Sequence, residues 1–286
     1  MRRLILATRG SGLALVQANM VKKLLEAQGA DVELRIVKTR GDRDQTSPLR
    51  HIGGKGLFVR EVELALQSGE ADLAVHSGKD LPYQLLEGMT IGANPPAADP
   101  RDCLITRAGE ILPEGAVIGT GSPRRIAECR RLYPQADYRE IRGNVDTRLR
   151  KLREGGYDAI FLAKAGLDRL QPDLAGLQVR IFEAEEVIPA PCQGILAVEC
   201  RENDREVLDL LAKIDHEESR QRFEAERSVF CALEADCSVA IGVHAERAEE
   251  QMEISVMFQG RRFQGTCSPG ETGGLAAQIR KEMLEK

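Results

Sequence analysis

The sequence predicts an α/β protein made of two related domains with mainly parallel sheets, followed by a small α+β domain. Strand-like and helix-like hydrophobic patterns alternate as far as residue 190, which is typical of βαβ units around a parallel sheet. This series of patterns occurs twice, and beyond Arg201 it changes to helices followed by short strands. We therefore expect two domains of one architecture and a third domain of a different kind.

The first domain is predicted from the elements near the N-terminus. A buried strand at residues 4–7 leads through a turn into a helix at residues 12–28, where apolar side chains recur at helical spacing. Ser11 stands at the N-cap position, and Gly29 ends the helix. The further elements that we expect are a strand at 32–38, an amphipathic helix at 57–67 and a strand at 72–75.

The second domain repeats this order. Residues 117–122 have the pattern of a strand and a turn, and Pro123 stands at the first helical position, where its missing N–H is harmless. The apolar segment at 157–163 corresponds to the one at 71–76. The elements expected between them are a helix at 126–132, a strand at 138–141 and a helix at 144–153.

The last segment predicts a small α+β domain with an antiparallel three-stranded sheet. The proline-rich residues 95–100 are the expected hinge, and residues 189–194 are the expected return crossing. The expected elements are helices at 204–213, 217–233 and 272–285, with strands near 239–246, 252–259 and 261–267. The expected domains are residues 1–96 with 195–213, residues 99–190, and residues 217–286.

The composition is ordinary for a globular protein and argues against two classes of partner. Of 286 residues, 42% are hydrophobic and 30% are charged. A net charge of -5, 4% aromatic residues and the absence of tryptophan argue against nucleic-acid binding. No apolar segment approaches the ~20 residues that span a bilayer, and the N-terminal apolar run is too short for a signal peptide. We therefore expect a cytoplasmic protein that does not bind membranes.

The seven cysteines predict free thiols. They are odd in number and show no C-x-x-C spacing, which argues against a disulfide framework and against a structural zinc site. Most lie in apolar segments and are expected to be small core residues, with no metal bound. Cys237 differs because it lies in a short loop between a long helical pattern and a strand.

Basic and hydroxyl side chains gather at the predicted strand-to-helix turns. Ligands of open parallel sheets bind at the carboxyl ends of strands, where helix N-termini present free N–H groups. These side chains suit carboxylates or phosphates, although any single arginine could merely solvate a helix end. No G-x-x-x-x-G-K-[ST] loop is present, which argues against a P-loop nucleotide site. The candidate anion-binding residues are Arg9, Ser11, Lys55, Ser77, Lys79, Thr120, Ser122, Arg124, Arg125, Arg142 and Arg148.

Short motifs in a fixed order resemble those of one enzyme family. They are T-R-G-S at 8–11, G-G-K-G-L-F at 53–58, H-S-G-K-D-L-P at 76–82, D-P-R-D at 99–102 and R-G-N-V at 142–145. Together with Gln193, Gly194 and Cys237, this series is similar to the porphobilinogen deaminases, also called hydroxymethylbilane synthases. The resemblance covers almost the whole chain. Each motif is weak alone, and the ordered series is specific.

The resemblance implies a fold and a reaction. The family has three domains, the first two similar to type II periplasmic binding proteins. Its reaction joins four porphobilinogen molecules head to tail on a covalent dipyrromethane primer, releases ammonia each time, and frees hydroxymethylbilane by hydrolysis. The resemblance also implies a monomer that works in tetrapyrrole (heme) biosynthesis and passes its product to uroporphyrinogen-III synthase.

The resemblance implies roles for individual residues. Cys237 matches the thioether anchor of the cofactor, a role that suits a nucleophilic thiolate. Asp80 matches the catalytic aspartate, which stabilises a pyrrole cation and assists proton transfer; its local sequence alone also fits an N-cap or turn. Positions that match cofactor contacts are Lys55, Ser77, Lys79, Thr120, Ser122, Arg124, Arg125, Arg142, Gly143 and Gln193. Positions that match substrate contacts are Arg9, Ser11, Arg148 and Arg169.

Some positions depart from the family pattern, and two other hypotheses remain open. The departures are Gly10, Gly12, His51, Ala97 and the pair Ala235-Asp236. A non-catalytic anion-binding protein of the periplasmic-binding-protein type would explain the two domains and the basic turns, but not the third domain or Cys237. An enzyme that forms a Schiff base would use Lys79 or Lys164.

Overall fold

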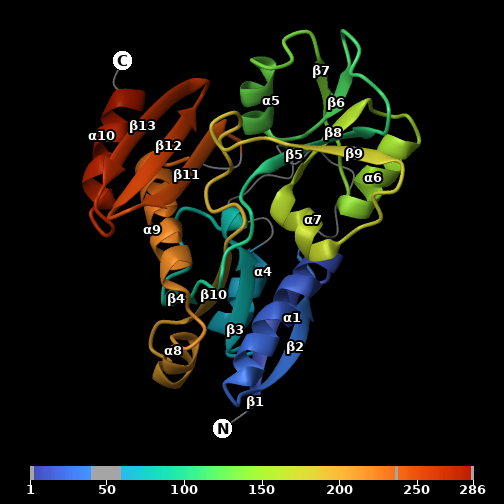
Figure 1. Ribbon diagram of the computed structural model, residues 1–286. Helices are drawn as coiled ribbons and strands as arrows, with labels where there is room; N and C mark the ends of the chain where they lie inside the picture. The colour runs from blue at the N-terminus through green and yellow to red at the C-terminus, as the bar shows by residue number, and fades with distance from the viewer. Residues whose placement is uncertain (1–2, 40–58, 236–237, 285–286) are drawn as a thin grey trace.

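The computed structural model describes residues 3–39, 59–235 and 238–284. Figure 1 shows two α/β units, one below the other, and a third unit of helices and strands beside them. The expected fold class is confirmed, since both α/β units contain a five-stranded sheet and the third unit contains a three-stranded antiparallel sheet. The exact domain limits expected from the sequence stay a prediction.

The first sheet has the strand order β2-β1-β3-β10-β4. Strand β1 pairs in parallel with both β2 and β3, and β10 runs antiparallel to both β3 and β4. The other four strands therefore share one direction, as expected for a mainly parallel sheet. The strands are β1 (Arg3–Arg9), β2 (Asp31–Val37), β3 (Leu73–Ser77), β4 (Met89–Ala93) and β10 (Leu196–Arg201).

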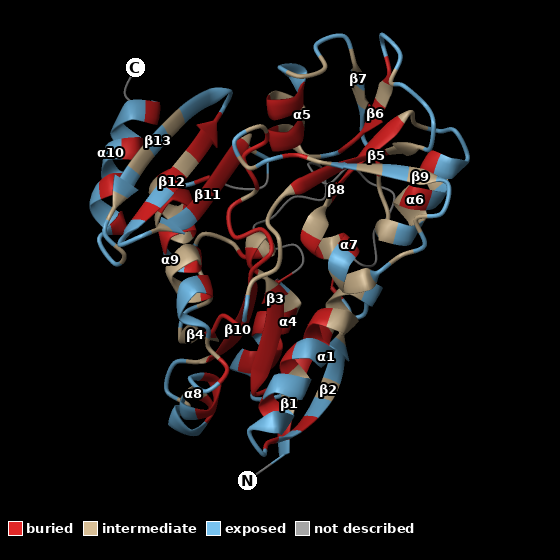
Figure 2. Ribbon diagram, viewed as in Figure 1, coloured by how far each residue is buried: buried red, intermediate tan, exposed pale blue. Residues whose placement is uncertain are grey.

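Helices cover both faces of this sheet and bury its core. On one face, α1 (Gly12–Ala27) and α8 (Arg205–Leu211) pack over Leu6, Val75 and Val198. On the other face, α4 (Arg60–Gln67) packs over Ala7 and Ala74. Nearly all residues of β3 and β10 are buried, and Figure 2 draws these strands mainly in red. The sequence pattern of this domain therefore produces a conventional three-layer unit.

The second sheet repeats the first, with the order β7-β6-β8-β5-β9. Strand β6 pairs in parallel with β7 and β8, and β5 runs antiparallel to β8 and β9. Its strands are β5 (Asp102–Arg107), β6 (Val117–Gly119), β7 (Asp137–Arg139), β8 (Ala159–Ala163) and β9 (Leu177–Ile181). Its helices are α5 (Pro123–Arg130), α6 (Val145–Arg153) and α7 (Lys164–Leu170).

In each sheet, the antiparallel strand is the one that follows a crossing between the two units. Strand β5 begins directly after the first crossing, and β10 begins directly after the return crossing. The two crossings touch, because the Ala98 N–H donates to the Gly194 carbonyl over 3.1 Å. Gly194 has a φ of +88°, and an added Cβ would lie 2.3 Å from the Ala98 oxygen. Only glycine fits this close approach without a backbone shift.

The third unit is formed by α9 (Glu217–Ala232), β11 (Ile241–Ala248), β12 (Gln251–Phe258), β13 (Arg261–Cys267) and α10 (Thr272–Leu284). Helices α9 and α10 pack on one face of the sheet around Phe230, Val256 and Ile279. The predicted elements of this segment are confirmed to within a few residues. Arg262 links this unit to the second one by donating to the carbonyls of Glu185 and Glu186 and to the Glu128 carboxylate.

Some elements differ from the expectation. The strand expected at 138–141 is β7 at Asp137–Arg139, and Ile141 lies in the core beyond its end. The first two residues of the helix expected at 57–67 lie outside the described residues, and the described part begins at Arg60. Strands β4, β5, β9 and β10 were not expected individually.

Candidate active site

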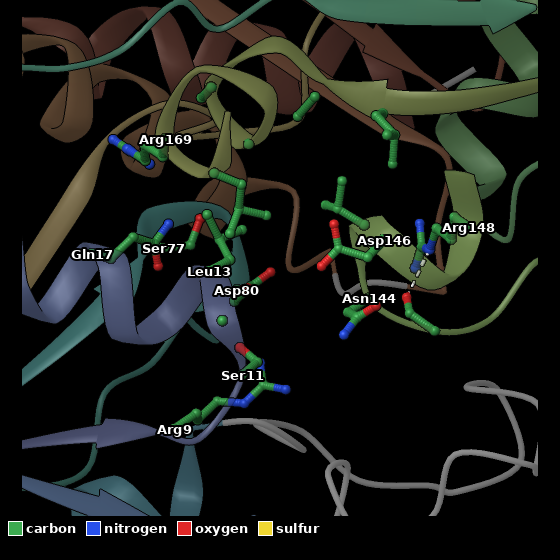
Figure 3. Close-up of a pocket in the computed structure, with 18 of the residues that line it drawn as sticks. Arg9, Ser11, Leu13, Gln17, Ser77, Asp80, Asn144, Asp146, Arg148 and Arg169 are labelled. Carbon is green, nitrogen blue, oxygen red and sulfur yellow. Dashed lines mark hydrogen bonds between the residues drawn. The ribbon is translucent and has the colours of Figure 1, made fainter. Parts of the chain in front are cut away.

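A cavity of about 1040 Å³ lies between the two α/β units. It is lined by the N-terminal ends of α1 and α6, the turn after β3, helix α7 and the return crossing. Figure 3 shows Ser11 and Asp80 on one wall, Asn144 and Arg148 on the opposite wall, and Arg169 above them. The predicted site residues that line this cavity are Arg9, Ser11, Ser77, Lys79, Asp80, Arg125, Arg142, Gly143, Arg148, Arg169 and Gln193.

Side-chain caps set the helix ends that face the cavity. The Ser11 hydroxyl accepts from the Ala14 N–H at the start of α1, and Asn144 accepts from the Thr147 N–H at the start of α6. Each cap satisfies one of the N–H groups that a helix leaves unpaired at its first turn. The remaining N–H groups and the helix dipole favour an anion at this edge.

Asp80 ends a single-turn 3-10 helix, Gly78–Asp80, that directly follows β3. The strand is buried in the middle of its sheet, and the chain turns sharply at Gly78, whose N–H donates to the Ile195 carbonyl over 2.8 Å. Figure 3 shows the Asp80 carboxylate pointing into the cavity. A carboxylate is therefore held at the centre of a site whose other charged groups are mainly cations.

Lys79 is bound to the return crossing. Its ammonium donates to the Gln193 side-chain oxygen over 3.2 Å. Burial, together with the positive charge of Arg125, lowers the pKa of Lys79 from 10.5 to about 8, against a smaller opposing effect of Asp80. An anion bound beside Lys79 would favour the charged form that this environment disfavours.

Two arginines at the start of α5 share one buried carboxylate. Arg124 donates to Asp102 over 2.5 Å, and Arg125 donates to it over 2.7 Å. Burial alone would raise the pKa of Asp102, but the charges and hydrogen bonds of Arg124 and Arg125 hold it well below its usual range. Asp102 therefore stays ionised at any physiological pH.

Two further arginines lie in the cavity wall with little compensating charge. Burial, with the nearby charges of Arg125 and Arg142, lowers the pKa of Arg148 to about 10. Burial lowers the pKa of Arg169 to about 10 as well, and its Nε is buried without a hydrogen-bond partner. The contacts that the two side chains make are with carbonyls: Arg148 donates to Gly143 and Arg169 to Gly194. Partly buried cations of this kind are expected where an anionic ligand completes the site.

A smaller pocket of about 120 Å³ adjoins Lys79 where the three units meet. Its walls include Ser122 and Arg124 from the second unit and Arg227 and Val239 from the third. Thr120 lines neither cavity; it is buried, and its hydroxyl accepts from the Ser122 N–H over 3.2 Å. Among the described residues, the predicted cofactor contacts therefore line the two adjacent cavities, except for Thr120, which contacts Ser122 behind the smaller one.

Two predicted site residues, Lys55 and Cys237, lie outside the described residues, as does His51. The six other cysteines are free thiols, four of them buried. Burial raises the pKa of all six, to about 12 for Cys103, Cys129 and Cys200. A raised pKa reduces the thiolate fraction on which nucleophilic attack depends.

Some residues of the site were not predicted. Gln17, Lys38 and Asn144 line the large cavity, and Asp102 lies directly behind it. Asn144 was within reach of sequence reasoning, since an Asn before an amphipathic helix is a common N-cap. Gln17 could have been identified as a polar residue on the otherwise apolar side of α1.

Other classes of site receive no support from the described part of the chain. Within it, no group of three or more His, Cys, Asp or Glu side chains is placed to hold a metal ion. No helix there has both the length and the apolar character needed to cross a bilayer.

Comparisons with known proteins point to one family. Residues 4–209 match the family model described as "Porphobilinogen deaminase, dipyromethane cofactor binding domain". The porphobilinogen deaminase of Roseiflexus sp. is 43% identical over 293 residues, covering 99% of this chain and 96% of that protein. The porphobilinogen deaminase of Nitratidesulfovibrio vulgaris is 47% identical over 251 residues, covering 86% of this chain and 79% of that protein.

Two solved structures are among those with partial similarity to this chain. The VFT2 domain of Bordetella pertussis BvgS has a TM-score of 0.46 and 17% identity, covering 79% of this chain and 92% of that chain. An ancestral arginine-binding protein bound to glutamine has a TM-score of 0.41 and 14% identity, covering 75% of this chain and 91% of that chain.

Proposed function

This chain belongs to the porphobilinogen deaminase family, and we propose that the large cavity is where it joins four porphobilinogen molecules head to tail. The observation that carries the proposal is the Asp80 carboxylate in a cavity whose other charged lining residues, apart from Asp146, are arginines and lysines. The reaction releases ammonia at each step and hydroxymethylbilane at the end. The comparisons do not favour a non-catalytic anion-binding protein.

The residues of the two cavities fit a dipyrromethane cofactor and pyrrole substrates. Each pyrrole carries an acetate and a propionate, so a growing chain accumulates negative charge. The lowered pKa values of Lys79, Arg148 and Arg169 and the unpartnered Nε of Arg169 are the features that such carboxylates would satisfy. When bound, dipyrromethane supplies the pyrrole carbon from which the product chain grows.

Asp80 is the proposed catalytic residue. Its carboxylate would accept a hydrogen bond from a pyrrole N–H and stabilise the positive charge that develops on the substrate ring as ammonia leaves. The same oxygen is placed to hold a proton during the exchange that follows.

Cys237 is the proposed anchor of the cofactor. The raised pKa values of the six described cysteines argue against each of them as the nucleophile. Val239, two residues beyond Cys237 in the chain, lines the smaller pocket together with Lys79 and Arg124. An anchor in this part of the chain would start the cofactor near those two cations.

The predicted binding residues form two proposed groups. Residues proposed to hold the cofactor are Lys55, Ser77, Lys79, Thr120, Ser122, Arg124, Arg125, Arg142, Gly143 and Gln193, with Thr120 acting through Ser122. Residues proposed to hold substrate or the growing chain are Arg9, Ser11, Arg148 and Arg169. We further propose that the chain acts as a monomer in the cytoplasm and that its product passes to uroporphyrinogen-III synthase.

Replacing Asp80 tests the catalytic assignment. The Asp80→Asn variant keeps the size of the side chain and loses its charge, so we expect a folded protein that carries the cofactor but has lost at least about 10²-fold in kcat. The measurement is release of ammonia and hydroxymethylbilane from porphobilinogen, with intact-protein mass as the check on cofactor content. The matched control is Asp209→Asn, an exposed aspartate of α8 far from the cavity, which should keep wild-type turnover. Wild-type turnover by Asp80→Asn would remove Asp80 from the mechanism.

A further inference from the structure

We propose that Asp102 is a positioning residue, which fixes Arg124, Arg125 and Gln193 in the orientation that receives the cofactor. The inference rests on the proposed function, because it concerns groups assigned there to cofactor binding. Asp102 is the first residue of β5 and stands at the end of the first crossing between the units. It has no solvent-exposed surface and lines neither cavity, so it acts through other side chains.

Asp102 fixes both guanidinium groups of α5. Its Oδ2 accepts from Arg124 Nη1 over 2.5 Å, and its Oδ1 accepts from Arg125 Nη2 over 2.7 Å and Nε over 3.1 Å. Each arginine has one further anchor: Arg124 donates to the Ile188 carbonyl over 2.9 Å, and Arg125 to the Phe161 carbonyl over 3.2 Å. Two like charges are thereby held side by side, one facing the small pocket and one facing the large cavity.

Asp102 also determines which way the Gln193 amide faces. The Gln193 Nε2 group donates to Asp102 Oδ1 over 3.1 Å and to the Pro100 carbonyl over 2.6 Å. The amide oxygen is therefore turned toward Lys79, whose ammonium donates to it over 3.2 Å. The opposite orientation would set an amide oxygen against a carboxylate and an NH₂ group against an ammonium. A continuous chain of hydrogen bonds thus runs from α5 through the return crossing to the turn that carries Asp80.

The Asp102 carboxylate partly neutralises the positive charges of this cluster. Arg124 and Arg125 share the buried Asp102 carboxylate, and the third cation, Lys79, is under the electrostatic influence of both Asp80 and Asp102. Asp102 reduces the repulsion among them, yet it leaves excess positive charge for a ligand carboxylate. Its negative charge also raises the pKa of Lys79, against the opposing effect of Arg125. Removing that charge should therefore lower the pKa of Lys79.

The test compares wild-type protein with Asp102→Asn. We expect a folded protein in which the fraction of molecules that carry the cofactor falls by about tenfold, since the buried network has lost its negative charge and one of its two acceptor oxygens. In the molecules that are loaded, the alkaline limit of kcat/KM should move to lower pH, because the pKa of Lys79 falls. The measurements are intact-protein mass, thermal unfolding and the pH profile of kcat/KM corrected for the loaded fraction.

A matched control separates positioning from a purely structural role. Asp158 is a partly buried aspartate of the same unit, whose carboxylate accepts from the Val117 N–H over 2.7 Å, and it lines neither cavity. Asp158→Asn should lower the unfolding temperature without changing cofactor content or the pH profile. If Asp102→Asn behaved in the same way, or retained full cofactor and the wild-type profile, the positioning role would be overturned.

A second variant covers the case in which Asp102→Asn does not accumulate as folded protein. Asp102→Glu keeps the charge and moves the carboxylate oxygens by one methylene, so we expect folded protein with a reduced cofactor fraction. Full cofactor content and wild-type kinetics in Asp102→Glu would overturn the proposal. The result is distinguishable from failure of the proposed function, because in that case the wild-type chain itself would carry no covalent pyrrole.

Discussion

Single charged groups decide what the cavity binds, and Lys79 is the one whose protonation is most sensitive near physiological pH. Its pKa is lowered from 10.5 to about 8 by burial and by Arg125. Between about pH 8 and pH 10.5, Lys79 binds fewer protons in the folded, ligand-free chain than in the unfolded chain. The resulting cost to stability is fully present below about pH 8 and disappears as the pH rises toward 10.5. A bound anion removes the same cost by favouring the charged lysine.

This linkage predicts the pH dependence of cofactor assembly. The rate at which cofactor-free chain takes up porphobilinogen should fall as the pH rises through about 8, because Lys79 loses its charge. Lys79→Arg keeps a positive charge to higher pH, so its rate at pH 9 relative to pH 7 should exceed the wild-type ratio. The measurement is the increase in protein mass with time at each pH. Coincident profiles for the two proteins would show that Lys79 does not control uptake.

At the same scale, sequence reasoning placed most of the cavity but not the group behind it. Arg9, Ser11 and Lys79 were expected because polar residues at the ends of parallel strands converge on one edge. Asp80 was expected because it matches the catalytic aspartate of the family. Asp102 lies in the D-P-R-D motif at 99–102, but its partners Arg125 and Gln193 are 23 and 91 residues away in the sequence. Local sequence carries no information on contacts at such separations.

At the scale of elements, helices with clear caps were predicted to within a few residues, whereas some short strands, β5 and β10 among them, were not predicted. Helix α1 was expected at 12–28 and lies at Gly12–Ala27, since Ser11 and Gly29 mark its ends. Strands β5 and β10 are buried on both faces, so they lack the alternation that reveals a strand with one wet face. Their positions follow from the two crossings, which only the folded chain brings together.

The contact between the crossings predicts an unusually sensitive glycine. Gly194→Ala would bring Cβ within 2.3 Å of the Ala98 oxygen at a φ of +88°, so we expect a loss of more than about 3 kcal/mol in the free energy of unfolding. Gly176→Ala is the control, because its φ is +73° but nothing lies within 4 Å of the added Cβ; left-handed strain alone should cost about 1–2 kcal/mol. Urea unfolding measures both. Equal losses would mean that the close approach is not a constraint.

At the scale of the whole molecule, opposite charges are separated in space. The chain has a net charge of -5, yet cations line the cavity between the α/β units. This arrangement attracts polycarboxylates to one place. The duplicated architecture creates the cavity, because each unit turns the carboxyl ends of its strands toward the other.

The third unit is held against this arrangement by arginines from its helix and its sheet. Arg227 of α9 donates to the carbonyls of Pro82 and Tyr83, just beyond the turn that carries Asp80. Arg262 of β13 binds Glu128 of α5, the helix that carries Arg124 and Arg125. The third unit is thus connected to both walls of the site.

The central claim is that this chain builds a dipyrromethane primer on Cys237 and extends it in the large cavity. Intact-protein mass spectrometry with peptide mapping tests it most directly, before and after incubation with porphobilinogen, on wild-type protein and Cys237→Ala. We predict a mass excess of two linked pyrrole units on the wild-type peptide that contains Cys237, and no covalent pyrrole on Cys237→Ala. A wild-type chain that stays unmodified after incubation, or a pyrrole adduct that persists in Cys237→Ala, would contradict the account.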